Sequence, residues 1–244
     1  MGAAVTRSIL VVGAGEATGG AVARRFAREG YIACITRRNA DKLGPLAASI
    51  EAAGGRATPL ALDARDEAQV IATFQSIERN VAPLEVVVFN IGANVRFLVR
   101  DTTSRVFRKV WEMGCYAGFL IGREAARYLT PRGHGTIVFT GATASMRGRE
   151  GFAAFAAAKN GLRAVAQSMA RELGPQGIHV AHVVIDGMID TRFVAERFPE
   201  LYARRHEGSL LSPEAIAETY WQIHRQPREA WTHELDLRPW AEAW

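Results

Sequence analysis

Glycines follow the first apolar segment of the chain at a spacing that suits phosphate binding. Ser8 to Val12 is a β-rich run, and Gly13-Ala14-Gly15-Glu16-Ala17-Thr18-Gly19-Gly20 comes next. Ala21 to Arg28 then has helical spacing and leads to Gly30. In this order of strand, glycine turn and helix, the backbone can approach a pyrophosphate and the first helical amides point at it. The segment predicts a dinucleotide site whose members are Gly13, Gly15, Ala17 and Gly19.

Two adjacent arginines follow the second predicted strand, Tyr31 to Ile35. A site that prefers NAD carries an acid here for the ribose hydroxyls, and Thr36-Arg37-Arg38 has none. Guanidinium groups make paired, charge-assisted hydrogen bonds to phosphate, so Arg37 and Arg38 suit the 2′-phosphate of NADP. We therefore expect NADP rather than NAD as cofactor. Two solvated arginines at the start of a helix are the alternative.

Alternating strands and helices must position these residues. Apolar runs such as Val86 to Phe89 and Val180 to Ile185 recur between helical segments. This alternation predicts an α/β fold with a Rossmann-like, doubly wound parallel sheet and helices on both faces. At 244 residues, with no linker composition, residues 1–244 are expected to form a single NAD(P)-binding domain.

One long helix is predicted from Phe152 to Leu173, because the segment is rich in alanine, lacks proline and ends at Gly174-Pro175. Phe155 and Lys159 lie one turn apart on it. Phe155-Ala156-Ala157-Ala158-Lys159 resembles the Tyr-x-x-x-Lys signature of the short-chain dehydrogenase/reductase superfamily, and the resemblance covers nearly the whole chain. It implies hydride transfer with a nicotinamide, whose ribose Lys159 holds. A phenyl ring at position 155 has no ionisable proton.

Two other catalytic positions of the superfamily are also substituted. Its serine lies thirteen residues before the tyrosine, where this chain has Ala142. Its asparagine belongs to the pattern Asn-Leu-x-Gly-x-Phe, and the segment that matches begins with Gly114. Among the expected catalytic residues only Lys159 remains, so the resemblance implies an atypical site with different chemistry or none. Thr143 and Ser145 are candidate replacement hydroxyls, and Tyr116 is a weaker one.

The resemblance also implies further contacts to the cofactor. Leu60-Ala61-Leu62-Asp63 resembles a strand end whose aspartate contacts adenine, and Asn90-Ile91-Gly92 resembles the superfamily's Asn-Ala-Gly. Asp186-Gly187-Met188-Ile189-Asp190-Thr191 takes the place of Pro-Gly-x-x-x-Thr. Asp186 is an acid that could donate or accept a proton there, although a capping or turn role is the commoner one. The implied cofactor-binding residues are Asp63, Asn90, Gly92, Lys159, Gly187 and Thr191.

Composition limits the other function classes. The net charge of +5 comes with dispersed arginines, which indicates a solvated basic surface rather than a nucleic-acid site. The apolar runs are too short to cross a membrane, and Met1 to Arg7 has no signal-peptide pattern. Cys34 and Cys115 have no metal-ligand spacing and suit a cytoplasmic protein. We expect no metal, no membrane anchor and no nucleic-acid partner.

These observations predict an NADP(H)-binding, atypical oxidoreductase that acts on a small molecule or an acyl thioester, with reduction of an enoyl or acyl thioester as its chemistry. A nucleotide-sensing or scaffold protein without catalysis is the alternative. Members of the superfamily are usually dimers or tetramers, so the resemblance implies a homodimer or homotetramer built through the helices that contain Gly114 and Lys159.

Overall fold

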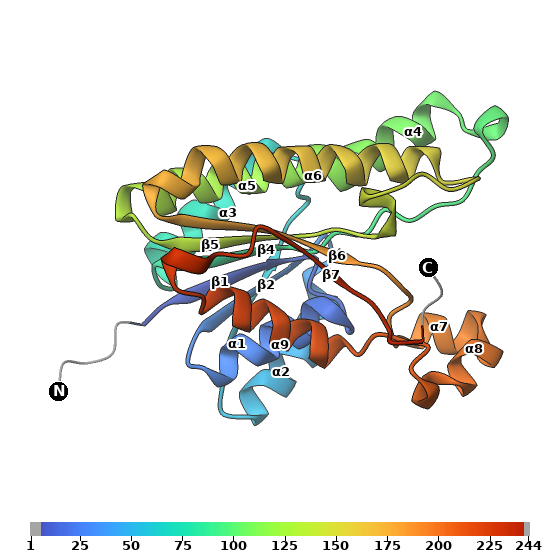
Figure 1. Ribbon diagram of the computed structural model, residues 1–244. Helices are drawn as coiled ribbons and strands as arrows, with labels where there is room; N and C mark the ends of the chain where they lie inside the picture. Colours follow the sequence, from blue (N-terminus) through green and yellow to red (C-terminus); the bar gives the residue numbers. More distant parts are fainter. Residues whose placement is uncertain (1–5, 242–244) are drawn as a thin grey trace.

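The computed structural model describes residues 6–241, which fold into three layers (Figure 1). A sheet of seven parallel strands forms the middle layer of these residues, in the order β3-β2-β1-β4-β5-β6-β7. The predicted Rossmann-like α/β fold is therefore confirmed. Its strands are β1 (Ser8–Val12), β2 (Ile32–Arg37), β3 (Arg56–Ala61), β4 (Leu84–Phe89), β5 (Gly135–Thr140), β6 (Ile178–Ile185) and β7 (Glu234–Leu237).

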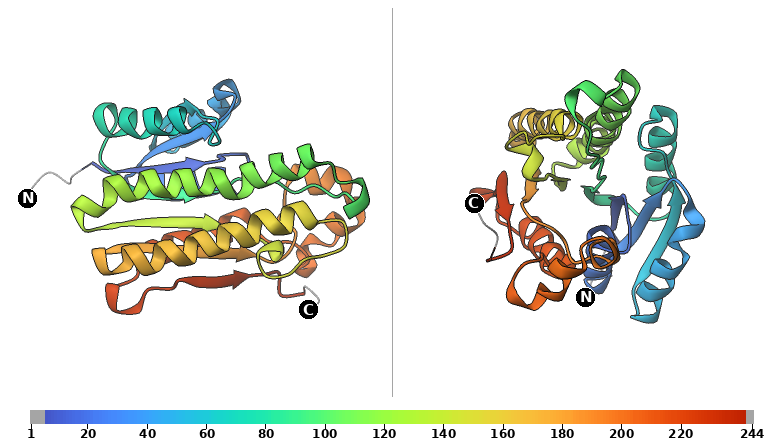
Figure 2. Two further views of the ribbon diagram at one scale, coloured as in Figure 1. Left: turned by 90° about the horizontal axis from the view of Figure 1, so that it is seen from above. Right: turned by 90° about the vertical axis from the view of Figure 1, so that its right-hand side faces the viewer.

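Helices cover both faces of the sheet (Figures 1 and 2). One face carries α1 (Thr18–Arg28), α2 (Gly44–Ala52) and α9 (Pro213–His224). The other carries α3 (Glu67–Asn80), α4 (Ser104–Trp111), α5 (Ala117–Leu129) and α6 (Ala153–Leu173). Two short helices, α7 (Arg192–Arg197) and α8 (Pro199–Ala203), follow β6 and lie beyond the carboxyl ends of the strands.

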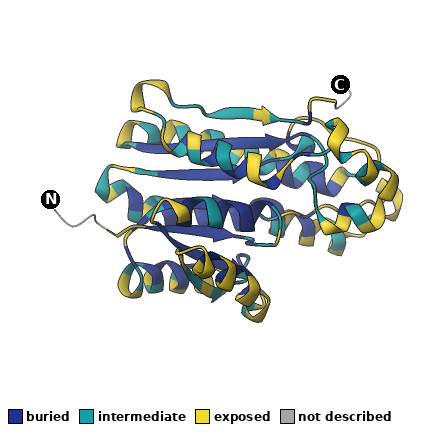
Figure 3. Ribbon diagram, turned by 90° about the horizontal axis from the view of Figure 1, so that it is seen from below, coloured by how far each residue is buried: buried dark blue, intermediate teal, exposed yellow. Residues whose placement is uncertain are grey.

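Side chains of each central strand alternate between two apolar cores. In β1, Ile9 and Val11 pack with the core under α1 and α9. Leu10 and Val12 pack with the core under α3, α5 and α6. Because both faces are covered, every residue of β1 is buried, and Figure 3 shows the same for the middle of the sheet. Double burial explains why the strands are nearly continuous apolar runs in the sequence.

The local sequence signals place the element boundaries well. The predicted long helix is α6, which begins one residue after Phe152 and ends before Gly174-Pro175. Within residues 6–241, no helix combines the length and the apolar character needed to cross a bilayer. The sequence shows no signal-peptide pattern over Met1 to Arg7, and residues 1–5 of that segment lie outside the described part of the chain.

Small residues let α6 pack closely against α5 and against the π-helical turn Glu112–Tyr116, which directly precedes α5. A Cβ atom at Gly114 would lie 2.9 Å from Cβ of Ala158. At Gly118 it would lie 2.3 Å from Cδ1 of Leu162. Real Cβ atoms do not approach other heavy atoms this closely, so the present spacing between the two helices depends on glycine at both positions.

We predict that Gly118→Ala destabilises the fold by about 1–3 kcal/mol, because the added methyl group overpacks this contact. The measurement is urea unfolding followed by circular dichroism. Leu162→Ala removes the side chain that the methyl group would meet. The double variant should therefore lose less stability than the sum of the two single variants, and additive losses would contradict the packing described here.

Candidate functional site

The glycine turn between β1 and α1 is tightly packed on one side and open on the other. Gly13 has φ of 89°, and a Cβ atom there would lie 2.7 Å from the carbonyl oxygen of Asn90. A Cβ atom at Gly19 would lie 2.4 Å from the carbonyl oxygen of Gly13. By contrast, nothing lies within 4 Å of a Cβ atom built at Gly15. Ala17 is the N-cap residue of α1 and has an ordinary negative φ, so its methyl group is accommodated.

Thr18 adds a polar group that the sequence reasoning missed. It begins α1 and is 4% exposed, and its Oγ1 has no hydrogen-bond partner among residues 6–241. Buried hydroxyl groups normally have partners. An unsatisfied hydroxyl in the first turn of a helix, beside an open glycine turn, fits an anionic ligand such as a phosphate. Its place directly after Ala17 in the glycine-rich segment was the available signal.

Asn90 braces the glycine turn from the end of β4. Its Nδ2 donates a hydrogen bond to the carbonyl oxygen of Gly13 at 3.2 Å, and its backbone N–H donates to Val12 at 2.8 Å. Gly92, two residues further on, has no atom within 4 Å of a built Cβ. The structure therefore brings Asn90 to the predicted dinucleotide site and gives it a structural contact there.

Arg37 and Arg38 lie at the carboxyl end of β2, the first half-buried and the second exposed. Neither side chain forms a hydrogen bond or an ion pair within the described part of the chain. Asp63 lies after the neighbouring strand β3 and is close enough for the charge of Arg38 to act on its carboxylate. Two guanidinium groups thus stand together at the carboxyl end of β2.

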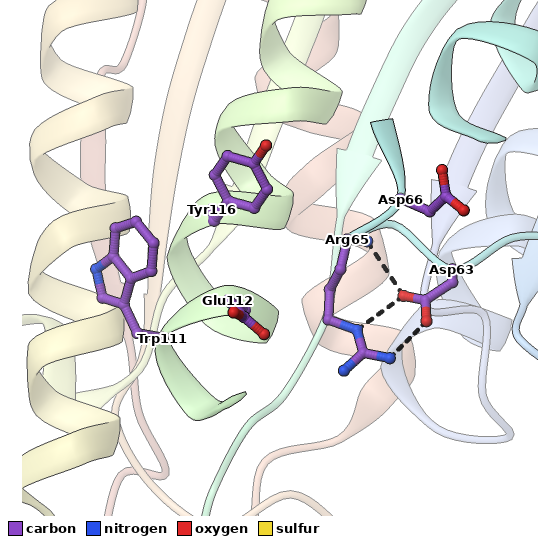
Figure 4. Close-up of a pocket in the computed structure, with 6 residues that line it drawn as sticks. All are labelled: Asp63, Arg65, Asp66, Trp111, Glu112 and Tyr116. Carbon is purple, nitrogen blue, oxygen red and sulfur yellow. Dashed lines mark hydrogen bonds and ion pairs between the residues drawn. The ribbon is translucent and has the colours of Figure 1, made fainter. Parts of the chain in front are cut away.

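The carboxylate of Asp63 is engaged by Arg65 (Figure 4). Arg65 donates from Nε at 2.9 Å and from Nη2 at 2.5 Å, and these hydrogen bonds hold the pKa of Asp63 below its usual value. The pair borders an open pocket of about 480 Å³ that Trp111 and Tyr116 line from the other side. If Asp63 contacts adenine, its carboxylate must therefore bind adenine and Arg65 at the same time.

Lys159 places a buried ammonium group between the ends of β4 and β5. Its side chain is 2% exposed, and Nζ donates to the carbonyl oxygens of Ile91 at 3.0 Å and Thr140 at 2.8 Å. Burial lowers the pKa of Lys159 to about 8. Residues 6–241 contain no group of three or more His, Cys, Asp or Glu that could hold a metal ion.

The three substituted positions meet in one apolar cluster. Phe155 is 8% exposed and packs there with Ala93, Val110 and Ala158, and Ala142 lies against the same cluster. A Cβ atom at Gly114 would point at Ala158 and Ala93 of this cluster. The structure therefore brings the three positions together, as the resemblance implies, but hydrocarbon surrounds them.

Gly187 and Thr191 follow β6. Gly187 has φ of 152°, and a Cβ atom there would lie 2.5 Å from Cδ of Pro239, so the C-terminal segment requires glycine. Thr191 is the N-cap of α7, where its Oγ1 accepts a hydrogen bond from the backbone N–H of Val194 at 3.2 Å. Its hydroxyl can still donate one hydrogen bond to a ligand.

Comparisons with known proteins agree with this geometry. The chain is 33% identical over 188 residues to the 3-oxoacyl-[acyl-carrier-protein] reductase MabA of Mycobacterium avium, covering 77% of this chain and 69% of that protein. A crystal structure of a short-chain dehydrogenase from Rhodopseudomonas palustris is 51% identical, covers 96% of this chain and 99% of that one, and superposes with a TM-score of 0.83.

A metagenomic short-chain oxidoreductase in complex with NADP shares the fold at 21% identity and a TM-score of 0.79, covering 97% of this chain and 98% of that one. The family model described as short chain dehydrogenase matches residues 7–201, most of the sequence. This match, together with the shared sheet and glycine turn, shows that the chain belongs to the short-chain dehydrogenase family.

Proposed function

We propose that this chain binds NADP(H) and catalyses an oxidoreduction in an atypical site, with an enoyl or acyl thioester as substrate. The observation that carries the proposal is the contrast around Lys159. Its buried ammonium group and the glycine turn are retained, whereas Ala142, Phe155 and Gly114 lack the hydroxyl and amide groups of the family pattern. A buried ammonium is costly, so its presence supports a bound partner.

The residues present fit a dinucleotide. Gly13 and Gly19 shape the turn, the orphan hydroxyl of Thr18 and the first amides of α1 suit the pyrophosphate, and Arg37 and Arg38 suit a 2′-phosphate. We assign Lys159 to the nicotinamide ribose, and we assign the further contacts to Gly15, Ala17, Asp63, Asn90, Gly92, Gly187 and Thr191. The bound nicotinamide would supply or accept the hydride. Residues 1–244 would act as one NAD(P)-binding domain.

The thioester assignment rests on the missing hydroxyls and on the surface near the site. Hydride addition to a conjugated thioester can draw its proton from water or another group, so it needs no phenol at position 155. Segments that follow β4, β5 and β6 expose large apolar side chains that suit an acyl chain, namely Phe97, Leu98, Val99, Met146, Phe193 and Phe198. MabA, a relative, is named for an acyl thioester.

We predict that Arg37→Ala and Arg38→Ala each weaken NADPH binding by about 10- to 100-fold, because each removes a charge-assisted hydrogen bond to the 2′-phosphate. NADH binding should change little. Nucleotide fluorescence titration measures both constants, and Arg79→Ala at the distant end of α3 is the control. Equal losses for NADPH and NADH would reject the phosphate assignment, and binding of neither nucleotide by the native chain would reject the proposed function.

The burial of Lys159 leads us to predict that NADPH binding depends on pH. The ammonium form donates to the ligand, and its pKa in the free protein is about 8, so the Kd of NADPH should rise as pH increases through that value. Between pH 7 and pH 9 the increase should be about tenfold if the bound lysine stays protonated. In Lys159→Met, binding should be weaker and nearly constant over this range. A native Kd that stays constant would contradict this role of Lys159.

A second copy of the chain is the proposed partner. Phe107 and Trp111 on α4 and Phe119 on α5 expose 42%, 40% and 38% of their surface. Tyr116 stacks between Trp111 and Phe119, with ring centroids 6.1 Å and 6.5 Å apart. An aromatic surface across neighbouring helices supports a homodimer or homotetramer built through α4, α5 and α6.

We predict that the combined variant Phe107→Glu and Trp111→Glu dissociates this oligomer, because the added carboxylates would repel one another across the interface. Light scattering coupled to size-exclusion chromatography gives the mass. Phe198→Glu, at an exposed position between α7 and α8, is the matched control and should keep the native mass. A native chain that elutes as a monomer at micromolar concentration would refute the assembly.

A further inference from the structure

A buried carboxylate lies at the carboxyl end of β6, directly before Gly187. Asp186 is 4% exposed, and its Oδ1 accepts a hydrogen bond from Oγ1 of Thr143 at 2.6 Å. Thr143 follows β5 and comes directly after Ala142, where the family pattern has serine. Because β5 and β6 are neighbouring parallel strands, their ends bring together two side chains that are 43 residues apart.

Two guanidinium groups compensate the charge of this carboxylate. Nη2 of Arg147, from the loop after β5, lies 3.5 Å from Oδ1. Nη2 of Arg238, after β7, lies 3.4 Å from Oδ2 and 3.0 Å from Asp236. The ammonium of Lys159 donates a hydrogen bond to the carbonyl oxygen of Thr140, the last residue of β5. The hydrogen bond from Thr143, at 2.6 Å, is shorter than these two arginine contacts.

The other candidate hydroxyl groups are occupied or point elsewhere. Ser145 is fully buried, and its Oγ accepts a hydrogen bond from the backbone N–H of Ala142 at 3.1 Å. Tyr116 stacks on Trp111 and lines the pocket beside Asp63 (Figure 4). Thr143 is only partly buried, so a substrate can reach its oxygen while its hydroxyl group donates a hydrogen bond to Asp186.

We propose that Thr143 and Asp186 form a proton relay that replaces the missing phenol of the family pattern. Thr143 is the catalytic residue that touches the substrate oxygen, and Asp186 acts through it. The arrangement pairs a reachable hydroxyl group with a buried base at hydrogen-bond distance, which is the geometry that acid–base catalysis requires. The inference rests on the proposed oxidoreductase function and extends it to the interconversion of alcohols and carbonyls.

In the oxidative direction, the O–H bond of the substrate alcohol breaks and its proton passes to Oγ1 of Thr143. The hydroxyl proton of Thr143 passes to the carboxylate of Asp186, which later releases it to water. The C–H bond at the same substrate carbon also breaks, and its electron pair leaves as hydride to NADP⁺, the oxidant in the proposed function. The alcohol is oxidised to a carbonyl. Reduction of a carbonyl follows these steps in reverse.

The test compares Thr143→Val and Asp186→Asn with the native chain in NADPH-dependent reduction of acetoacetyl-CoA, ethyl acetoacetate and phenanthrenequinone. Each variant should lose about 10²- to 10⁴-fold in kcat, which is the usual worth of a positioned acid or base, while the Kd of NADPH changes by less than about twofold. Thr143→Ser retains the hydroxyl group and should keep most of the activity. Asp236→Asn removes a carboxylate that pairs with the same Arg238 and is the matched control.

A variant in which the phenol is restored at position 155 distinguishes a proton-relay role of Asp186 from a merely structural one. In a background of Ala142→Ser and Phe155→Tyr, the proton has a second source, so adding Asp186→Asn should cost less than about tenfold in kcat. Gly114 stays unchanged in this background because its Cβ position meets Ala158. A structural defect would cost the same in both backgrounds.

Three other results of these measurements would overturn the relay. If the native chain reduces a probe and both single variants match it, the relay is wrong and the proposed function stands. A native chain that binds NADPH but reduces none of the three probes, while the phenol-restored background does, would overturn the relay together with the native oxidoreductase activity. Equal losses from Asp236→Asn and Asp186→Asn would mean that the arginine pairing alone matters.

Discussion

The buried ammonium group of Lys159 is the constraint on which the site depends. Its hydrogen bonds reach the carbonyl oxygens of Ile91 and Thr140, so one side chain ties α6 to the ends of β4 and β5. No carboxylate forms an ion pair with it within residues 6–241. An unpaired buried charge costs on the order of several kcal/mol, and backbone dipoles offset only part of that cost. The position therefore favours a ligand that shares the charge.

Holding Lys159 at this depth requires α6 to lie close to the sheet and to α5. Small side chains make that approach possible, since Gly114 and Gly118 leave room for Ala158 and Leu162. The same closeness excludes a larger residue at position 114 and leaves the neighbouring space to Phe155. Gly114 on one helical segment and Phe155 on the other are thus parts of one packing arrangement.

Local patterns predicted the sheet, the glycine turn and the α6 boundaries, because each depends on residues that are adjacent in sequence. The positions of Arg37, Arg38 and Asp63 at or after the ends of their strands were predictable for the same reason. Pairings across the fold were not: the sequence leaves Asp186 open between proton transfer and the commoner cap or turn role, and only the structure shows that Thr143 meets it across two strand ends. Asp63 was assigned to adenine without regard to Arg65, whose competition was visible two residues away. Thr18 was missed because its place in the glycine-rich segment does not show that its hydroxyl group is buried without a partner within residues 6–241.

The charge distribution around the site supports the proposed change of chemistry. A retired site would be expected to fill with hydrocarbon throughout, and the cluster around Phe155 has done so. Asp186, however, is a buried carboxylate with a short hydrogen bond and two guanidinium neighbours, all from segments at the carboxyl edge. An alanine or a proline there would avoid the cost of desolvating that charge. A compensated charge next to the partly exposed hydroxyl group of Thr143 therefore supports the proposed proton transfer at this edge of the sheet.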